Sequence, residues 1–402
     1  MRERRGVIVL IFTLVIVVFF AGARITEAAE ENSAAGDADR TSGTEEEPDE
    51  IAEAMKTEIL SEFDFSELDS SLREMFPEEK VSFSDIVSSL ISGGIDDAGD
   101  RIVQFLKDRI VYDFLYNRKT LVYIILAALV AAVFSNFADA FQNRQISDIS
   151  FYVIYMLLIT LCLTAFQTAV SGLEEKMGLL TEFIRALAPA YFMAMAFSSG
   201  SAAALVFYNL ILFLIYIVEL VIIHILLPAV NIYVMICVLG SLIEEDFLSE
   251  LAGLIRKAVT WALHGLLACV AGINIIQGLL APTVDSVKRS TLTRTAEAVP
   301  WVGDLMGGTA EILTGTVILI KNGIGMSGAV IALIICATPL LQMVVTALMY
   351  KLAAALVQPV SDKRIISCIR GVSEGYELLV RILFTAGSLF LITIAVTASF
   401  TS

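Results

Sequence analysis

The sequence contains little of what enzymes use for chemistry. Its 402 residues include two histidines and five cysteines, and charged residues make up only 17% of the chain. No two cysteines form a CxxC pair, so we predict neither a zinc site nor a disulfide framework. No Walker motif, glycine-rich phosphate loop or Ser/His/Asp arrangement follows a strand pattern. We therefore expect no enzyme activity, no metal and no cofactor.

Positive charge is scarce in the part of the chain where negative charge gathers. Residues 27–100 hold 23 acidic side chains but only four basic ones, so this segment accounts for the formal net charge of −16. Binding to nucleic acid needs clustered Lys and Arg that face phosphates. The acidic segment offers no such surface, and we expect no nucleic-acid partner.

Long apolar runs make up most of the remaining sequence. Hydrophobic residues account for 57% of the chain, and the mean hydropathy is +0.79. Several runs exceed the ~18–20 apolar residues that cross the hydrocarbon of a bilayer. The predicted fold class is an all-α polytopic membrane protein in contact with membrane lipid.

The first apolar run has the features of an export signal. MRERR is a basic start, residues 7–20 are apolar, and Ala21-Gly22-Ala23 fits the small-residue cleavage pattern. We predict a cleavable signal peptide at 1–23. An uncleaved signal anchor is the alternative, because the apolar run is at the long end of the ~7–15 residues expected. Either interpretation places the next segment outside the cytoplasm.

Two further parts follow the signal. Residues 24–118 form an acidic extracytoplasmic segment, in which 24–50 are rich in small and acidic residues and are predicted to be disordered. Residues 51–118 are predicted to be helical, since positions 102, 103, 106, 110 and 114 place apolar side chains on one side of a helix. Residues 119–402 form the polytopic membrane domain.

About eight transmembrane helices are predicted in that domain. Pro228 divides the apolar run from 201 to 243 into two crossings, and residues 178–200 are interpreted as interfacial or re-entrant. The basic loops around Arg144, Lys288 and Lys363 then all face the cytoplasm, as the positive-inside rule requires. The expected crossings are 121–141, 149–170, 201–227, 228–243, 258–280 and 382–400, together with two more that are either 303–320 and 326–345 or 312–338 and 339–360.

A weak internal repeat suggests a symmetric membrane domain. Pro189 and Pro228 are 39 residues apart, as are Pro300 and Pro339, and residues 247–253 align with 365–371. The two units, 182–281 and 293–402, would each contain three crossings. An odd number of crossings predicts an inverted repeat, the architecture of many secondary transporters. Chance similarity between apolar segments is the alternative.

One apolar run is interrupted by Lys321, Asn322 and two glycines. The favoured interpretation is an Asn322-Gly323 turn between crossings at 303–320 and 326–345, with the Lys321 ammonium in water. The alternative is a single crossing that breaks near 321–325 and carries Lys321 deep in the membrane. A charge at that depth needs a partner, for which Glu219 is the candidate. Pro228 and Pro339 complete the set of predicted polar or gating positions.

Five stretches resemble the stage III sporulation protein AE family of endospore-forming bacteria. They are ISDISFYVIYMLLITL (146–161), LPAVNIYVMICVLGSL (227–242), TLTRTAEAVPWVGD (291–304), LIKNGIGMSG (319–328) and YKLAAALVQP (350–359). The order of signal peptide, acidic segment and membrane domain is similar too. The resemblance covers nearly the whole chain and is weakest over residues 27–60.

The resemblance implies a role in an assembly rather than in catalysis. It implies a membrane component of the channel-like, secretion-like assembly that joins the mother cell to the forespore, acting as channel wall or platform. The implied partners are the other stage III sporulation AA–AH proteins, with AA as a separate secretion-type ATPase. The implied location is the mother-cell-derived membrane around the forespore, with 24–118 in the intermembrane space. A secondary transporter for a small solute is the alternative function, and self-association is left open.

Overall fold

The computed structural model describes residues 64–75, 82–91, six positions between 122 and 130, 144–199, 201–241, 248–296, 303–359 and 361–400. Every regular element in these residues is a helix. The elements are α3 (Ser66–Met75), α4 (Phe83–Ile91), α6 (Arg144–Ser199), α7 (Ser201–Ile217), the π-helix η1 (Val218–Leu226), α8 (Leu227–Gly240), α9 (Ser249–Ala296), α10 (Gly303–Val357) and α11 (Lys363–Phe400). The predicted signal peptide, the 24–50 segment and the amphipathic pattern at 102–114 lie outside the described residues.

Five helical stretches of the described part are long and apolar enough to cross a membrane. They run from Tyr155 to Ala196, Tyr208 to Gly240, Ser249 to Ile275, Thr316 to Val357 and Lys363 to Ala395. This agrees with an all-helical membrane protein. The count of eight crossings is not confirmed, and most of the expected 121–141 crossing lies outside the described residues.

Several helices continue through positions where the sequence predicted a break. α6 continues through 178–199 with Pro189 inside it, and α10 continues through Pro339. α7, η1 and α8 follow one another without a break from 201 to 240. In an apolar environment a helix satisfies the backbone groups within its own segment, whereas a turn leaves some of them unpaired. The expected divisions at Pro228 and at 321–325 are therefore wrong.

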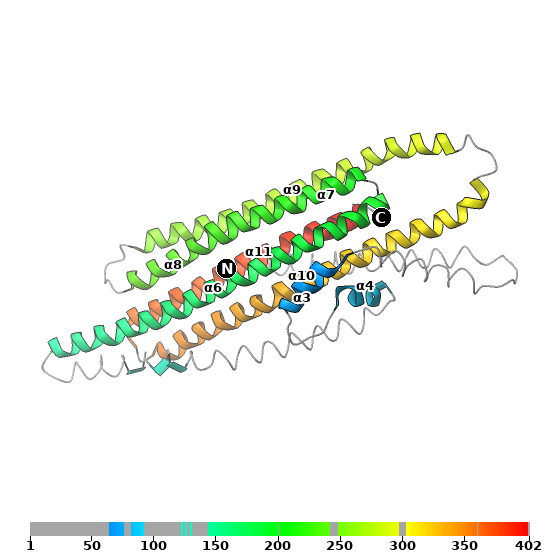
Figure 1. Ribbon diagram of the computed structural model, residues 1–402. Helices are drawn as coiled ribbons and strands as arrows, with labels where there is room; N and C mark the ends of the chain where they lie inside the picture. Colours follow the sequence, from blue (N-terminus) through cyan, green and yellow to red (C-terminus); the bar gives the residue numbers. More distant parts are fainter. Residues whose placement is uncertain are drawn as a thin grey trace.

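Long helices that follow one another along the chain run in opposite directions in a single bundle (Figure 1). α6, α9 and α11 run one way, while α7–α8 and α10 run the other way. α9 and α11 are therefore parallel. Contacts between residues 118 and 119 positions apart, Arg256 with Glu374 and Asn274 with Thr393, confirm this direction. An inverted repeat would make these two helices antiparallel, so the inverted relation is wrong for α9 and α11.

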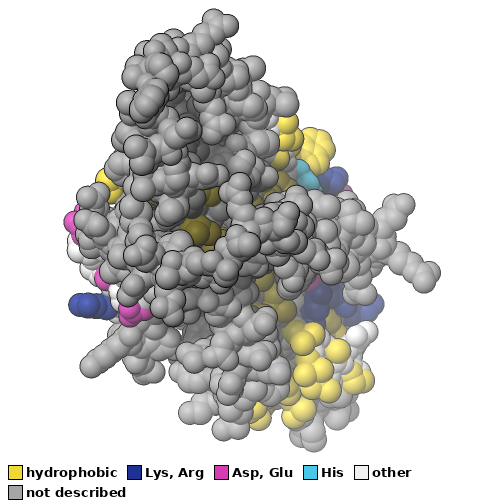
Figure 2. Space-filling view, turned by 90° about the vertical axis from the view of Figure 1, so that its right-hand side faces the viewer, with side chains coloured by type: hydrophobic (Ala, Val, Ile, Leu, Met, Phe, Trp, Pro, Cys, Tyr) yellow, Lys and Arg dark blue, Asp and Glu magenta, His cyan; other side chains and the backbone are white. Residues whose placement is uncertain are grey.

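α11 occupies the middle of the bundle. It contacts α6, α7, η1, α8, α9 and α10, and Leu379, Ile382 and Leu389 on it are completely buried. Outside this core, exposed apolar side chains are numerous, among them Trp261 and Leu348. The end-on view in Figure 2 shows such apolar side chains gathered on the described surface. An outer surface of this kind is expected where a protein faces lipid.

Two short helices of the predicted exported segment pack on the bundle. α3 lies against α6 and α4 against α10. The Asp69 carboxylate joins the two short helices, because it accepts a hydrogen bond of 2.7 Å from the backbone N–H of Phe83 at the start of α4. The rings of Phe65 and Phe83 lie 5.3 Å apart. The first part of α4 is thereby capped and anchored by α3.

Candidate functional site

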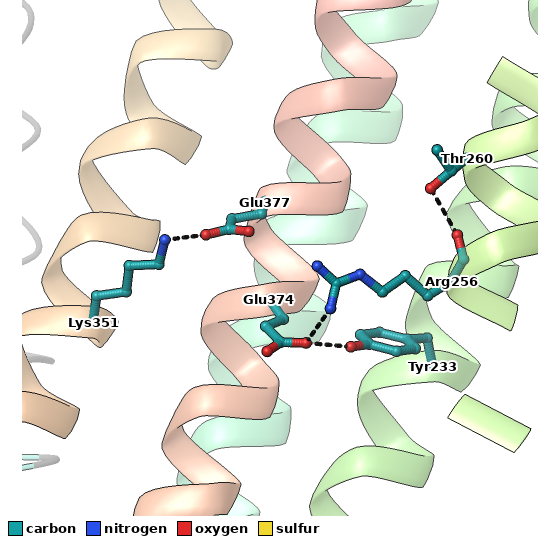
Figure 3. Close-up of polar contacts among 6 residues, drawn as sticks. All are labelled: Tyr233, Arg256, Thr260, Lys351, Glu374 and Glu377. Atoms are coloured by element: carbon teal, nitrogen blue, oxygen red, sulfur yellow. Dashed lines mark hydrogen bonds and ion pairs between the residues drawn. The ribbon is translucent and has the colours of Figure 1, made fainter. Parts of the chain in front are cut away.

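A polar cluster joins three helices around a carboxylate of α11. Oε2 of Glu374 accepts hydrogen bonds of 2.7 Å from the Tyr233 hydroxyl on α8 and of 2.7 Å from a guanidinium nitrogen of Arg256 on α9 (Figure 3). One turn along α9, Thr260 donates a hydrogen bond of 2.7 Å to the backbone carbonyl of Arg256. Hydrogen bonds that involve ionised groups are about twice as strong as neutral ones.

A second ion pair lies one turn further along α11. Glu377 pairs with Lys351 of α10, and Figure 3 shows Glu374 and Glu377 leaving α11 toward different neighbours. The two pairs connect α11 with helices on both sides of it. A lone charge that faces hydrocarbon costs ~2.5–3.5 kcal/mol or more, so ionisable residues in membrane helices are expected to be paired, as they are here.

The sequence prediction missed this cluster, although two signals pointed to it. Arg370, Glu374, Glu377 and Arg381 recur at intervals of four, three and four residues, which places them on one side of α11. The alignment of 247–253 with 365–371 also places Arg256 and Glu374 at equivalent positions. Neither signal names the partners, because partner choice depends on how the helices pack.

Lys321 lies in the interior of α10 and is completely buried. The helix is continuous at this point, so the favoured turn at Asn322-Gly323 is wrong, and so is the alternative of a helix broken near 321–325. Glu219 is not the partner that the sequence suggested: its carboxylate pairs with Arg185 of α6 at 3.5 Å, and its side chain is 48% exposed. A gating role for Lys321, Asn322 and Glu219 stays a prediction.

The glycines after Lys321 provide space for neighbouring helices. A Cβ atom on Gly323 would lie 2.6 Å from Ile91 of α4, and one on Gly325 would lie 2.9 Å from Tyr191 of α6. Small residues allow such close approach between membrane helices. The Gly-rich pattern that resembled a turn is therefore a packing surface for α4 and α6.

Pro228 and Pro339 lie inside continuous helices, with different local consequences. Pro228 is at the start of α8 and directly follows the π-helix η1. Proline lacks an N–H and its ring clashes with the carbonyl four residues earlier, so a wider turn before it relieves the clash. His224 lies on η1, where its Nδ1 is 2.8 Å from the carbonyl oxygen of Glu219. Pro339 is buried within α10.

A polar groove of about 600 Å³ opens between α3, α6 and η1. Its lining includes Glu67 of α3, Glu182 and Arg185 of α6, and Glu219 of η1. Thr181 also lines it and donates to the carbonyl of Gly178 at 2.8 Å. Within the described residues no three His, Cys, Asp or Glu side chains are placed to hold a metal ion. The groove is thus a polar surface where α3 meets the bundle.

Comparison with known proteins agrees with the sequence resemblance. The family model described as stage III sporulation protein AE matches residues 81–401. The chain is also 26% identical over 377 residues to the stage III sporulation protein AE of Bacillus subtilis (strain 168), which covers 92% of this chain and 94% of that protein. No solved structure matches the chain. Because the family model covers most of the residues, the chain belongs to the stage III sporulation protein AE family.

Proposed function

We propose that the protein is a wall or platform subunit of a trans-envelope assembly that connects the mother cell with the forespore. Membership in a sporulation family and five apolar helices support a sporulation membrane protein. The finer role is supported above all by one observation, the filled interior of the bundle. α11 occupies the centre, in contact with α6, α7, η1, α8, α9 and α10.

A filled interior favours a structural subunit over a secondary transporter. Transporters of inverted-repeat architecture bind solute near the midplane at broken helices. Here α6, α10 and α11 are continuous, and the small cavity between Ile184, Tyr191 and Ile394 has a volume of about 10 Å³. That volume holds no more than about one water molecule. A passage would need neighbouring subunits to complete it.

The proposed partners are the other stage III sporulation AA–AH proteins. A secretion-type ATPase among them, AA, would supply energy that this sequence has no motif to supply. The protein would lie in the mother-cell-derived membrane around the forespore, with residues 24–118 in the intermembrane space. The α3–α4 pair, packed on α6 and α10, would then present an acidic surface to partners there.

Purification of the intact complex tests this function. The protein with an affinity tag is isolated in mild detergent from sporulating cells, and its partners are identified by mass spectrometry. We expect several AA–AH proteins to be recovered with it, and the purified protein to move no solute when reconstituted alone. Recovery without partners, together with solute uptake by the isolated protein, would favour the transporter instead.

A further inference from the structure

The exposed side of α6 changes character along its length. Val153, Met156 and Leu157 are exposed and apolar near its start. From there to the level of the groove the exposed side chains are polar or charged. These residues, named here the α6 polar face, are Thr160, Thr164, Gln167, Thr168, Ser171, Glu174, Glu175, Glu182 and Arg185. At 3.6 residues per turn they lie within an arc of about 120°.

The length of the α6 polar face matches the thickness of a membrane. From residue 160 to residue 185 the helix rises about 38 Å, whereas the hydrocarbon core is about 30 Å thick. Carboxylates such as Glu174 and Glu175 are exposed on it. In hydrocarbon each would cost ~2.5 kcal/mol or more, so lipid tails are an unfavourable neighbour for this face.

The outer face of α10 differs at the same level of the bundle. The Tyr376 ring contacts both Phe166 of α6 and Tyr350 of α10, at centroid distances of 5.2 and 5.3 Å. Gln167 and Leu348 therefore lie at similar heights. On α10 the exposed residues around this height are apolar apart from Lys351: Val344, Leu348, Leu352, Ala355 and Leu356. The outer face of α10 is therefore compatible with lipid, whereas the α6 polar face is compatible with water.

We propose that the α6 polar face lines a water-filled passage, which neighbouring subunits close. The inference rests on the proposed function, because a single convex helix face cannot enclose a conduit. The passage leads to the groove beneath α3, where Glu67 and Glu182 continue its acidic lining. Carboxylates exceed basic groups on the α6 polar face, so hydrated cations pass it more readily than anions.

Cysteine labelling at matched depth tests the passage. Gln167→Cys and Leu348→Cys are made in full-length protein without its five native cysteines and are assayed in membranes of sporulating cells. A charged, membrane-impermeant thiol reagent should modify position 167 at least about tenfold faster than position 348, since lipid excludes the charge. Thr164→Cys replaces Gln167→Cys if the latter does not accumulate. A cationic reagent should also react faster at 167 than an anionic one of similar size.

Each other outcome overturns a stated part of the inference. Equal labelling of 167 and 348 would place this level of the bundle outside the bilayer. Failure to label 167 or 164 would mean that protein or lipid covers the α6 polar face. Equal rates with both reagents would remove the preference for cations. Labelling of 167 in protein that recovers no AA–AH partners would keep the passage and reject the proposed function.

Discussion

α6 and α11 are both long apolar helices that carry charged residues. Charged side chains of α11 face neighbouring helices, whereas charged side chains of α6 lie on an exposed surface. α11 is central, and Glu374 on it is held by side chains from α8 and α9. α6 is peripheral, and Glu174 and Glu175 on it are exposed. The same residue type therefore ties helices together in one place and forms a polar surface in the other. The difference teaches that packing, not composition, decides what a charge does in a membrane helix.

The largest loss of stability is expected when a buried charged side chain of α10 is removed. Lys321→Ala removes a long, completely buried side chain and should destabilise the protein by about 2–5 kcal/mol, as other large-to-small core changes do. The measurements are the midpoint of thermal unfolding in detergent and the protein level in sporulating cells. Glu182→Ala on the exposed side of α6 is the matched control and should stay within about 0.5 kcal/mol. If both variants lose equally little stability, buried and exposed charged residues do not differ in the way proposed.

The second-largest loss of stability is expected when the carboxylate that joins three helices is removed. Glu374→Ala removes the acceptor of both Tyr233 and Arg256 and should cost about 1.5–3 kcal/mol, the range for hydrogen bonds to charged groups. Partial exposure, 31% for Glu374 and 40% for Arg256, keeps the cost below that of a fully buried pair. Glu175→Ala on α6 is the control. If both variants unfold at the wild-type temperature, the cluster is not a structural tie.

Two glycines, one on α11 and one on α6, differ in how closely neighbouring helices pack on the backbone. A Cβ on Gly375 of α11 would collide with Val234 and approach Phe166, whereas one on Gly172 of α6 would meet no atom within 4 Å. Gly375→Ala should therefore cost about 1–3 kcal/mol through overpacking. Gly172→Ala should stabilise by about 0.5–1 kcal/mol through helix propensity. Thermal unfolding of the two variants should move in opposite directions, and a shared direction would contradict the packing shown here.

The smallest effect concerns a contact of α6 with α10. Lys176 donates a hydrogen bond of 2.7 Å to the side-chain oxygen of Gln342. Gln342→Met keeps the volume and removes the acceptor, so a loss of about 0.5–1.5 kcal/mol is expected. Gln167→Met on the α6 polar face should be nearly silent in the same unfolding assay. A larger loss at 167 than at 342 would mean that the α6 polar face is covered by protein.

Local sequence signals predicted the class of the protein and misjudged its helix ends. An Asn-Gly pair is a strong turn signal in water, yet Asn322-Gly323 lies within α10. A proline commonly ends a helix, yet Pro189 and Pro339 lie within α6 and α10. Both rules assume that water can satisfy the freed backbone groups. Among packed apolar helices that help is missing, so the helices continue.

Partners across the bundle could not be predicted from spacing alone. Glu219 seemed available to Lys321 because both interrupt apolar runs, but the bundle places Glu219 beside Arg185. Arg256, Tyr233 and Glu374 come from three helices and meet only because α8 and α9 pack on α11. Contacts between residues more than a hundred positions apart depend on packing of the whole bundle.

The sequence by itself determined that this protein is helical, lies in a membrane and belongs to a sporulation family, because apolar run length and the order of motifs are local properties. Only the tertiary structure decided that α9 and α11 are parallel and that α6 exposes a polar face. It also decided that α4 packs against Gly323 and α6 against Gly325. Those features follow from which helix faces bury one another. A helix has several faces of comparable apolarity, and the choice among them is made by the close packing of all the helices together.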